Sequence, residues 1–144
     1  MLNKSLKNIV NENYIIDFAK SLKGVDTVTS LCFGDFNPIT RKKCEIITAC
    51  HENLNRHGFI GRSNPIIVVP LFKRKFLNNN DWESAMCCLS NHRLVNYVLD
   101  VESSSPTDVL DRFRSDFVFV DRLTGMGSEL ESFAKRCRIK LLMV

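Results

Sequence analysis

The feature that most constrains the fold of this chain is a pair of short apolar runs that show no polar alternation. They are Ile66–Phe72 (IIVVPLF) and Phe117–Val120 (FVFV). Strands that are apolar on both faces are typical of a parallel sheet covered by helices on both sides. Helical patterns separate these runs, as the crossover connections of a parallel sheet require. The sequence therefore predicts an α/β fold.

The same periodicities predict strands and helices that alternate along the chain after a first helix. The expected strands are 27–33, 66–72, 97–102, 117–120 and 140–144, and the expected helices are 3–23, 44–57, 81–94, 106–115 and 128–137. Thr40, Asp81 and Ser128 are suitable helix N-caps, and Pro106 suits the first position of its helix. We expect a single domain made of an N-terminal helix (1–26) and an α/β unit (27–144).

Composition excludes several classes of protein. The chain has 144 residues, 44% of them hydrophobic and 25% charged, which is ordinary for a soluble globular domain. No apolar run approaches the ~20 residues that cross a bilayer, and 1–13 shows no signal-peptide pattern. We therefore expect no membrane association and a cytoplasmic location. The net charge of +4 suits anionic small molecules and is below that of a dedicated nucleic-acid binder.

The cysteines predict free thiols in a reducing compartment. None of the six forms a Cys-x-x-Cys pair, and Cys87 and Cys88 are adjacent, so they cannot easily bond to each other. The three histidines also lack a pairing pattern. The sequence therefore predicts no metal site of this kind.

A ten-residue stretch after the first strand carries the strongest functional signal. It reads Gly34-Asp35-Phe36-Asn37-Pro38-Ile39-Thr40-Arg41-Lys42-Lys43. A strand, a tight turn and a helix start in this order place exposed backbone N–H groups at a helix N-terminus, where anions bind readily. Ligands of open parallel sheets also bind at the carboxyl ends of strands. We expect a phosphate or nucleotide site here, and the alternative is a plain connecting turn set by Asn37-Pro38.

Residues Gly34 to Thr40 resemble the signature of the nucleotidyltransferase superfamily, which includes cytidylyltransferases and nicotinamide mononucleotide adenylyltransferases. The family motif runs Gly, Ser or Thr, Phe, Asn or Asp, Pro or a similar residue, an aliphatic residue, His or Thr, two variable residues and His. The order of elements from Val28 onward is also similar to the family. The resemblance implies a Rossmann-like three-layer sandwich with a five-stranded parallel sheet of order 3-2-1-4-5. In this chain the extra N-terminal helix precedes it.

The resemblance implies transfer of a nucleoside monophosphate from ATP or CTP to a phosphorylated small molecule, with Mg²⁺. Thr40 and Lys43 stand at its catalytic positions, and Asn37 and Thr40 donate to phosphate oxygens. The positions that the resemblance or the topology assigns to nucleotide or phosphate binding are Gly34, Asp35, Phe36, Asn37, Arg41, Lys42, Arg93, Asp121 and Arg122. Gly34 permits a close phosphate approach, and Phe36 packs the turn.

Departures from the motif motivate other functions. Lys43 stands where the family has its second His, and Asp35 stands where Ser or Thr is usual. The family's Ser/Thr-rich motif with a downstream Arg, which follows its fifth strand, has no counterpart in the sequence. One alternative is a catalytically inactive homologue that binds a protein partner. Another is an RNA-associated module that uses the basic triplets 41–43 and 73–75.

Overall fold

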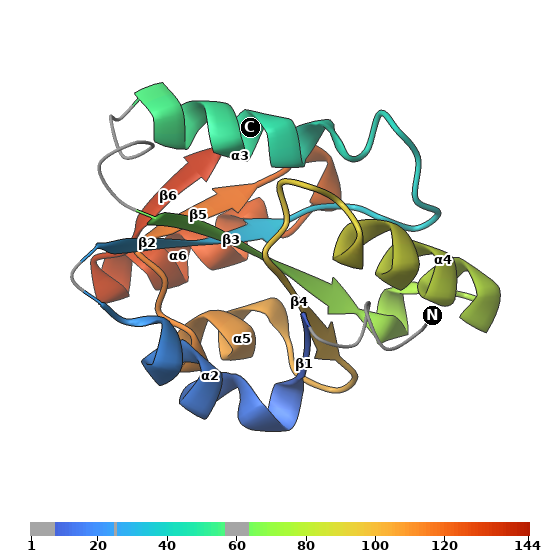
Figure 1. Ribbon diagram of the computed structural model, residues 1–144, viewed down its shortest axis with the longest axis horizontal. Coiled ribbons are helices and arrows are strands. Elements are labelled where there is room, and N and C mark those ends of the chain that lie inside the picture. The colour runs from blue at the N-terminus through green and yellow to red at the C-terminus, as the bar shows by residue number, and fades with distance from the viewer. Residues whose placement is uncertain (1–7, 25, 57–63) are drawn as a thin grey trace.

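The computed structural model describes residues 8–24, 26–56 and 64–144 and has an α/β fold with three layers (Figure 1). Within these residues the sheet contains six parallel strands in the order β1-β4-β3-β2-β5-β6. The strands are β1 (Ile9–Asn11), β2 (Thr27–Phe33), β3 (Asn64–Phe72), β4 (Tyr97–Val101), β5 (Phe117–Val120) and β6 (Lys140–Met143). The described part of the chain contains no helix long and apolar enough to cross a membrane.

The five expected strands lie in the expected order, but the expected number of strands is wrong. The sixth strand, β1, pairs with β4 at one edge of the sheet, where Ile9 lies opposite Val98. The helix expected over 3–23 is correspondingly shorter: in the described part of that range, a 3₁₀ helix η1 (Glu12–Tyr14) precedes α2 (Ile15–Leu22). A strand of three residues is too short to show the period of two that distinguishes it from a helix.

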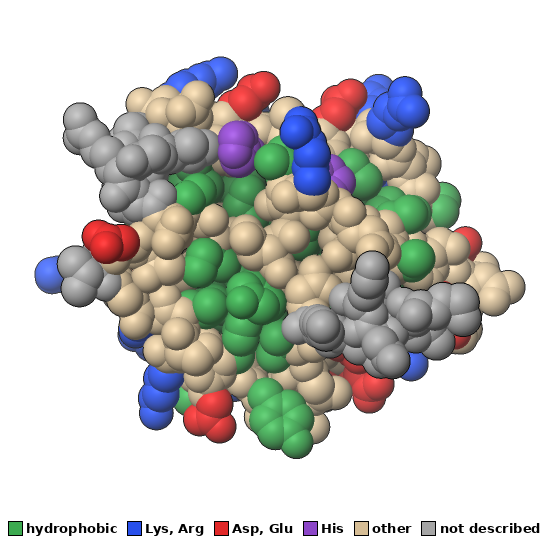
Figure 2. All heavy atoms as spheres, in the orientation of Figure 1, with side chains coloured by type: hydrophobic (Ala, Val, Ile, Leu, Met, Phe, Trp, Pro, Cys, Tyr) green, Lys and Arg blue, Asp and Glu red, His purple; other side chains and the backbone are tan. Residues whose placement is uncertain are grey.

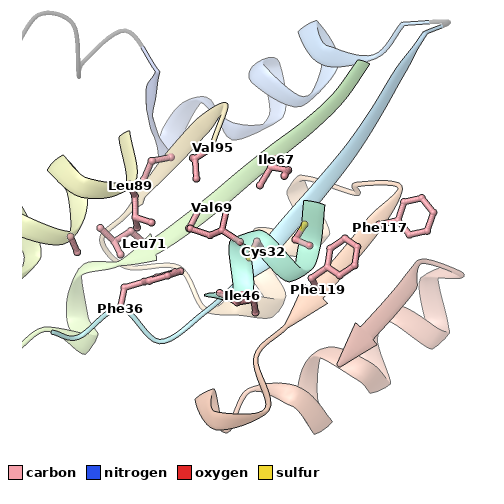
Figure 3. Packing of buried hydrophobic residues seen from close by; sticks show 14 of the residues in the cluster. Cys32, Phe36, Ile46, Ile67, Val69, Leu71, Leu89, Val95, Phe117 and Phe119 are labelled. Carbon is pink, nitrogen blue, oxygen red and sulfur yellow. The ribbon is translucent and has the colours of Figure 1, made fainter. Parts of the chain in front are cut away.

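Helices cover both faces of the sheet, as the apolar runs predict. One face packs against α3 (Glu45–Arg56) and α4 (Asn79–Ser90), and the other packs against α2, α5 (Pro106–Arg112) and α6 (Gly127–Cys137) (Figure 1). Alternate residues of β3 divide between the two cores: Ile67, Val69 and Leu71 belong to the first, and Val68 and Phe72 to the second. Figure 3 draws the first core, between the sheet and α3 and α4.

Local hydrogen bonds decide where the helices begin. Ser105 and Asp108 form a capping box at α5, and Pro106 occupies the first turn as expected. Of the three expected caps, Asp81 and Ser128 are wrong. The cap of α4 is Asn78, whose side chain accepts the N–H of Asp81, and α6 begins at Gly127, before Ser128. An Asn three residues before Asp81 satisfies that N–H, so the helix starts earlier than Asp81 itself indicates.

Candidate functional site

The strand order creates a crevice at the carboxyl edge of the sheet. The chain leaves β2 for β3 on one side, reaches β4, and then returns to β5 on the other side of β2. The loops that follow β2 and β5 therefore diverge at this edge, which is where open parallel sheets bind ligands. Three segments meet here: the loop from Gly34, the 3₁₀ helix η2 (Lys73–Lys75) and the 3₁₀ helix η3 (Arg122–Thr124).

Gly34 and Phe36 fix the start of the loop after β2. A Cβ atom at Gly34 would lie 2.6 Å from the ring of Phe36, so the tight packing of this ring requires glycine. The Phe36 side chain is only 2% exposed and joins the core with Ile46 of α3 (Figure 3). Phe36 therefore anchors the loop, in agreement with its expected packing role.

Asp35, Asn37 and Lys43 form a polar network next to this anchor. The ammonium Nζ of Lys43 lies 3.2 Å from the carboxylate Oδ2 of Asp35 and donates to the backbone oxygen of Asn37 at 2.9 Å. The other carboxylate oxygen of Asp35 accepts the backbone N–H of Asn37 at 3.2 Å. The amide of Asn37 donates to the backbone oxygen of Lys75, which joins the loop to η2. Two residues expected to contact phosphate, Asn37 and Lys43, therefore bond to the protein itself.

The backbone N–H groups of residues 43–45, where α3 begins, bond within their own turn. The Thr40 hydroxyl accepts the N–H of Lys43 at 3.2 Å, and the N–H groups of Cys44 and Glu45 bond to carbonyl oxygens of residues 40–42. Thr40 thus caps this turn as expected, although α3 itself begins only at Glu45. These three N–H groups already have partners, whereas Lys42, Lys43 and Lys75 bring cationic side chains to this edge of the sheet.

Two adjoining cavities open at this edge. The first has a volume of about 260 Å³ and lies between β2, β3 and η3. It is lined by Gly34, Asp35, Phe36, Asn37, Pro70, Leu71, Phe72, Lys75, Phe76, Leu123, Thr124 and Met126. The second has a volume of about 480 Å³ and is lined by Asp35, Thr40, Lys42, Lys43, Glu45, Ile46, Ala49, Asp121, Leu123 and Val144. Asp35 and Leu123 line both cavities, so they stand at the junction between the two.

The residues after β5 close one side of the site. The Asp121 carboxylate lines the second cavity and accepts the N–H of Leu123 at 2.9 Å, which caps η3. Leu123 is 84% exposed even though it lies at the junction of the cavities. Arg122 and Arg41 are exposed, and neither lines these cavities. Leu123 carried no sequence signal, because a single leucine in a loop shows no periodicity.

Arg93 lies at the opposite end of the strands from this site. It belongs to the connection between α4 and β4, and that connection precedes the amino end of a strand parallel to β2. The structure therefore places Arg93 at the opposite edge of the sheet from Gly34. A crossover helix returns the chain from the carboxyl edge to the amino edge, so a residue that follows α4 cannot lie beside the loop after β2.

The second basic triplet divides between two places. Lys75 lines the first cavity. Lys73 instead lies over the indole of Trp82, with its Nζ 4.6 Å from the ring centroid, and 3.9 Å from the Glu102 carboxylate. On the face drawn in Figure 2, Lys and Arg side chains are dispersed among acidic ones and do not gather into one basic patch. Lys75 and Lys73 thus lie in different surroundings.

The remaining candidate groups for chemistry at the site are the cysteines and clusters of possible metal ligands. The cysteines there are free thiols, and no group of three His, Cys, Asp or Glu residues could hold a metal ion. A hydrogen bond with Cys50, together with burial, raises the pKa of the Cys32 thiol well above its usual value. Cys32 is therefore protonated and inert in the core next to the site.

Comparisons with models of known protein families and with curated proteins gave no match to this chain. The resemblance in the loop after β2 therefore remains a prediction from the sequence motif. A Rossmann-like arrangement of strands hosts many unrelated activities, so the function must be argued from the site.

Proposed function

We propose that the chain binds the phosphate of a nucleotide or phosphorylated small molecule in the two adjoining cavities. One observation carries the proposal: the cavities lie where the strand order diverges, and Lys42, Lys43 and Lys75 line them. Cations around a partly enclosed space attract phosphoryl oxygens more strongly than cations on an open surface do, because less water screens them. The combined space suits a small molecule.

Within this proposal, Lys43 and Thr40 act on the phosphate. Lys43 supplies a cation 3.2 Å from Asp35, which lines both cavities, and Thr40 lines the second cavity. In nucleotidyl transfer, an acceptor phosphate oxygen attacks the α-phosphorus of the triphosphate, and the bond to the departing pyrophosphate breaks. Positioning and charge neutralisation supply the rate enhancement of such a step.

Magnesium fits this site only as a companion of the triphosphate. Asp35 and Asp121 both line the second cavity, but each already bonds within the protein, and no cluster of three metal-ligating side chains occurs among the described residues. Mg²⁺ commonly binds through one or two carboxylates together with substrate phosphates. Asp35 and Asp121 are the residues that would hold it, and the ion would neutralise phosphate charge.

Binding is tested by isothermal titration with ATP, CTP, the corresponding monophosphates and inorganic phosphate. We expect micromolar to millimolar affinity for at least one of these compounds and a loss of about tenfold in Lys43→Ala, because one cation contact is removed. Lys135→Ala is the matched control, since Lys135 is an exposed cation on α6. If no compound binds, or if both variants lose the same affinity, the site is misassigned.

Transfer is a separate question that needs its own assay. Release of pyrophosphate is measured with each nucleoside triphosphate, Mg²⁺ and a panel of phosphorylated acceptors. Turnover that disappears in Thr40→Val and Lys43→Ala supports a transferase. Binding without turnover supports the second candidate function, an inactive homologue that binds a partner. The engagement of Lys43 by Asp35 favours this second candidate, because a cation held by the protein is less available to a transition state.

A further inference from the structure

The proposed phosphate site already contains an anion of its own. The carboxylate of Asp35 lies at the junction of the two cavities, 3.2 Å from the Lys43 ammonium. Lys43 is the only lysine of the described site that forms an ion pair there. A phosphate that binds Lys43 must therefore take the place that the Asp35 carboxylate now occupies beside the ammonium.

Asp35 is held where it is by a second contact. Its other oxygen accepts the N–H of Asn37, and Asn37 in turn bonds to Lys43 and to Lys75 through its backbone oxygen and its amide. The carboxylate is thus fixed by the loop rather than free to rotate out of the cavities. Its side chain is nevertheless 41% exposed, so it faces any molecule that enters.

We infer that Asp35 is a specificity-determining residue that limits the negative charge of the ligand. Each oxygen of a bound phosphate competes with the carboxylate for Lys43 and is repelled by it at short range. The repulsion grows with the charge of the ligand, whereas contacts to neutral parts of a ligand do not change. The site therefore favours ligands of low charge, such as a phosphomonoester or phosphodiester, over a free triphosphate. This inference rests on the proposed function.

The test compares inorganic phosphate, pyrophosphate and tripolyphosphate, which differ in charge and carry no base. Affinities are measured by titration calorimetry in EDTA at low ionic strength for the wild-type chain and for Asp35→Asn. The amide is nearly isosteric, and its oxygen can still accept the Asn37 N–H. We expect Asp35→Asn to bind all three compounds more tightly than the wild type does. The ratio of the variant's affinity to the wild-type affinity should rise about fivefold for each negative charge added to the ligand. Added salt should reduce this ratio.

Two further variants separate charge from shape. Asp35→Glu keeps the charge, so the ratio of its affinity to that of the wild type should not rise with the charge of the ligand. Asp17→Asn removes an exposed carboxylate from α2, on the other face of the sheet. Its affinity for each compound, divided by the wild-type affinity, should stay near one. Circular dichroism and urea unfolding confirm that each variant is folded.

The outcomes separate this inference from the proposed function. If the wild type binds and Asp35→Asn binds equally or more weakly, or if its ratio does not depend on ligand charge, Asp35 sets no charge limit and the phosphate site stands. If Asp35→Asn gains binding that the wild type lacks, with the expected charge dependence, the inference is supported. If neither protein binds any of the three compounds, the phosphate site and the charge limit both fail.

Discussion

Two carboxylates lie at the carboxyl edge of the sheet in contrasting surroundings. Glu12 is 7% exposed and follows β1, whereas Asp35 follows β2 and its side chain is 41% exposed. Glu12 accepts hydrogen bonds from the backbone N–H of Glu102 and from the N–H and hydroxyl groups of Ser103 and Ser104. Asp35 accepts one backbone N–H and pairs with one lysine.

The difference separates a carboxylate committed to the fold from one that remains available to a ligand. Burial by itself raises the pKa of Glu12, but hydrogen bonds from the Ser104 hydroxyl and from backbone N–H groups of Ser103, Ser104 and Glu102 lower it to about 2. The anion is therefore strongly favoured in the folded state. Asp35 keeps unused acceptor positions beside two cavities, so an entering molecule can exchange its contacts.

The largest expected effect in this comparison is the loss of the Glu12 carboxylate. A shift of the pKa from 4.5 to about 2 corresponds to about 3 kcal/mol of unfolding free energy at neutral pH. Glu12→Gln should lose about this amount, because its amide N–H groups face donors rather than acceptors. Urea unfolding at pH 7 measures the change, with Glu52→Gln on the exposed part of α3 as the control. A loss no larger than that of the control contradicts the structural role of Glu12.

The same carboxylate makes stability depend on pH. The pKa of Glu12 is lowered in the folded state, so its contribution is complete above about pH 4.5 and is lost as the pH falls towards 2. The difference in unfolding free energy between the wild type and Glu12→Gln should therefore shrink over this range. Urea titrations at pH 7, 4.5 and 3 follow it. A difference that stays constant down to pH 3 shows that the charge of Glu12 is not what stabilises the fold.

A smaller loss of unfolding free energy is expected when the side chain of Arg112 is removed. This side chain bonds to the segment around Glu12. Its guanidinium donates to the backbone oxygen of Glu12 at 3.0 Å and to the Ser104 hydroxyl. Arg112→Ala should lower the unfolding free energy by about 1–2 kcal/mol, because a partly buried acceptor loses a charged donor. Arg114→Ala removes an exposed arginine paired with Asp111 and should cost less than Arg112→Ala, because ion pairs in contact with solvent contribute little. Equal losses in the two variants mean that the Arg112 contacts add nothing specific.

The smallest expected effect is the coupling between Asp35 and Lys43. Their pair is partly exposed, and such pairs contribute about 0–1 kcal/mol to stability. A double-mutant cycle of Asp35→Asn and Lys43→Met, measured by urea unfolding, gives the coupling energy directly. A coupling energy near 3 kcal/mol would mean that this pair stabilises the fold as much as the Glu12 carboxylate does. The contrast between the two carboxylates would then disappear.

Sequence reasoning located the Asp35 region and missed the Glu12 site for a physical reason. The residues around Asp35 are consecutive, so one short motif revealed the turn and its charges. Glu12 meets its partners 90 to 92 positions later in the chain. Local patterns do not specify which polar groups meet across such a separation. Arg93 differs, because the family resemblance assigned it to the site although the crossover through α4 leaves it at the amino ends of the strands.

The sequence by itself determined the alternation of strands and helices and the burial of the central strands on both faces. These properties are local, because they depend on the spacing of apolar side chains along each segment. Only the tertiary structure decided that β1 joins the sheet, that Glu12 meets the serine turn and that Asp35 pairs with Lys43. Those contacts depend on the order in which strands assemble side by side, and on the space that their loops leave.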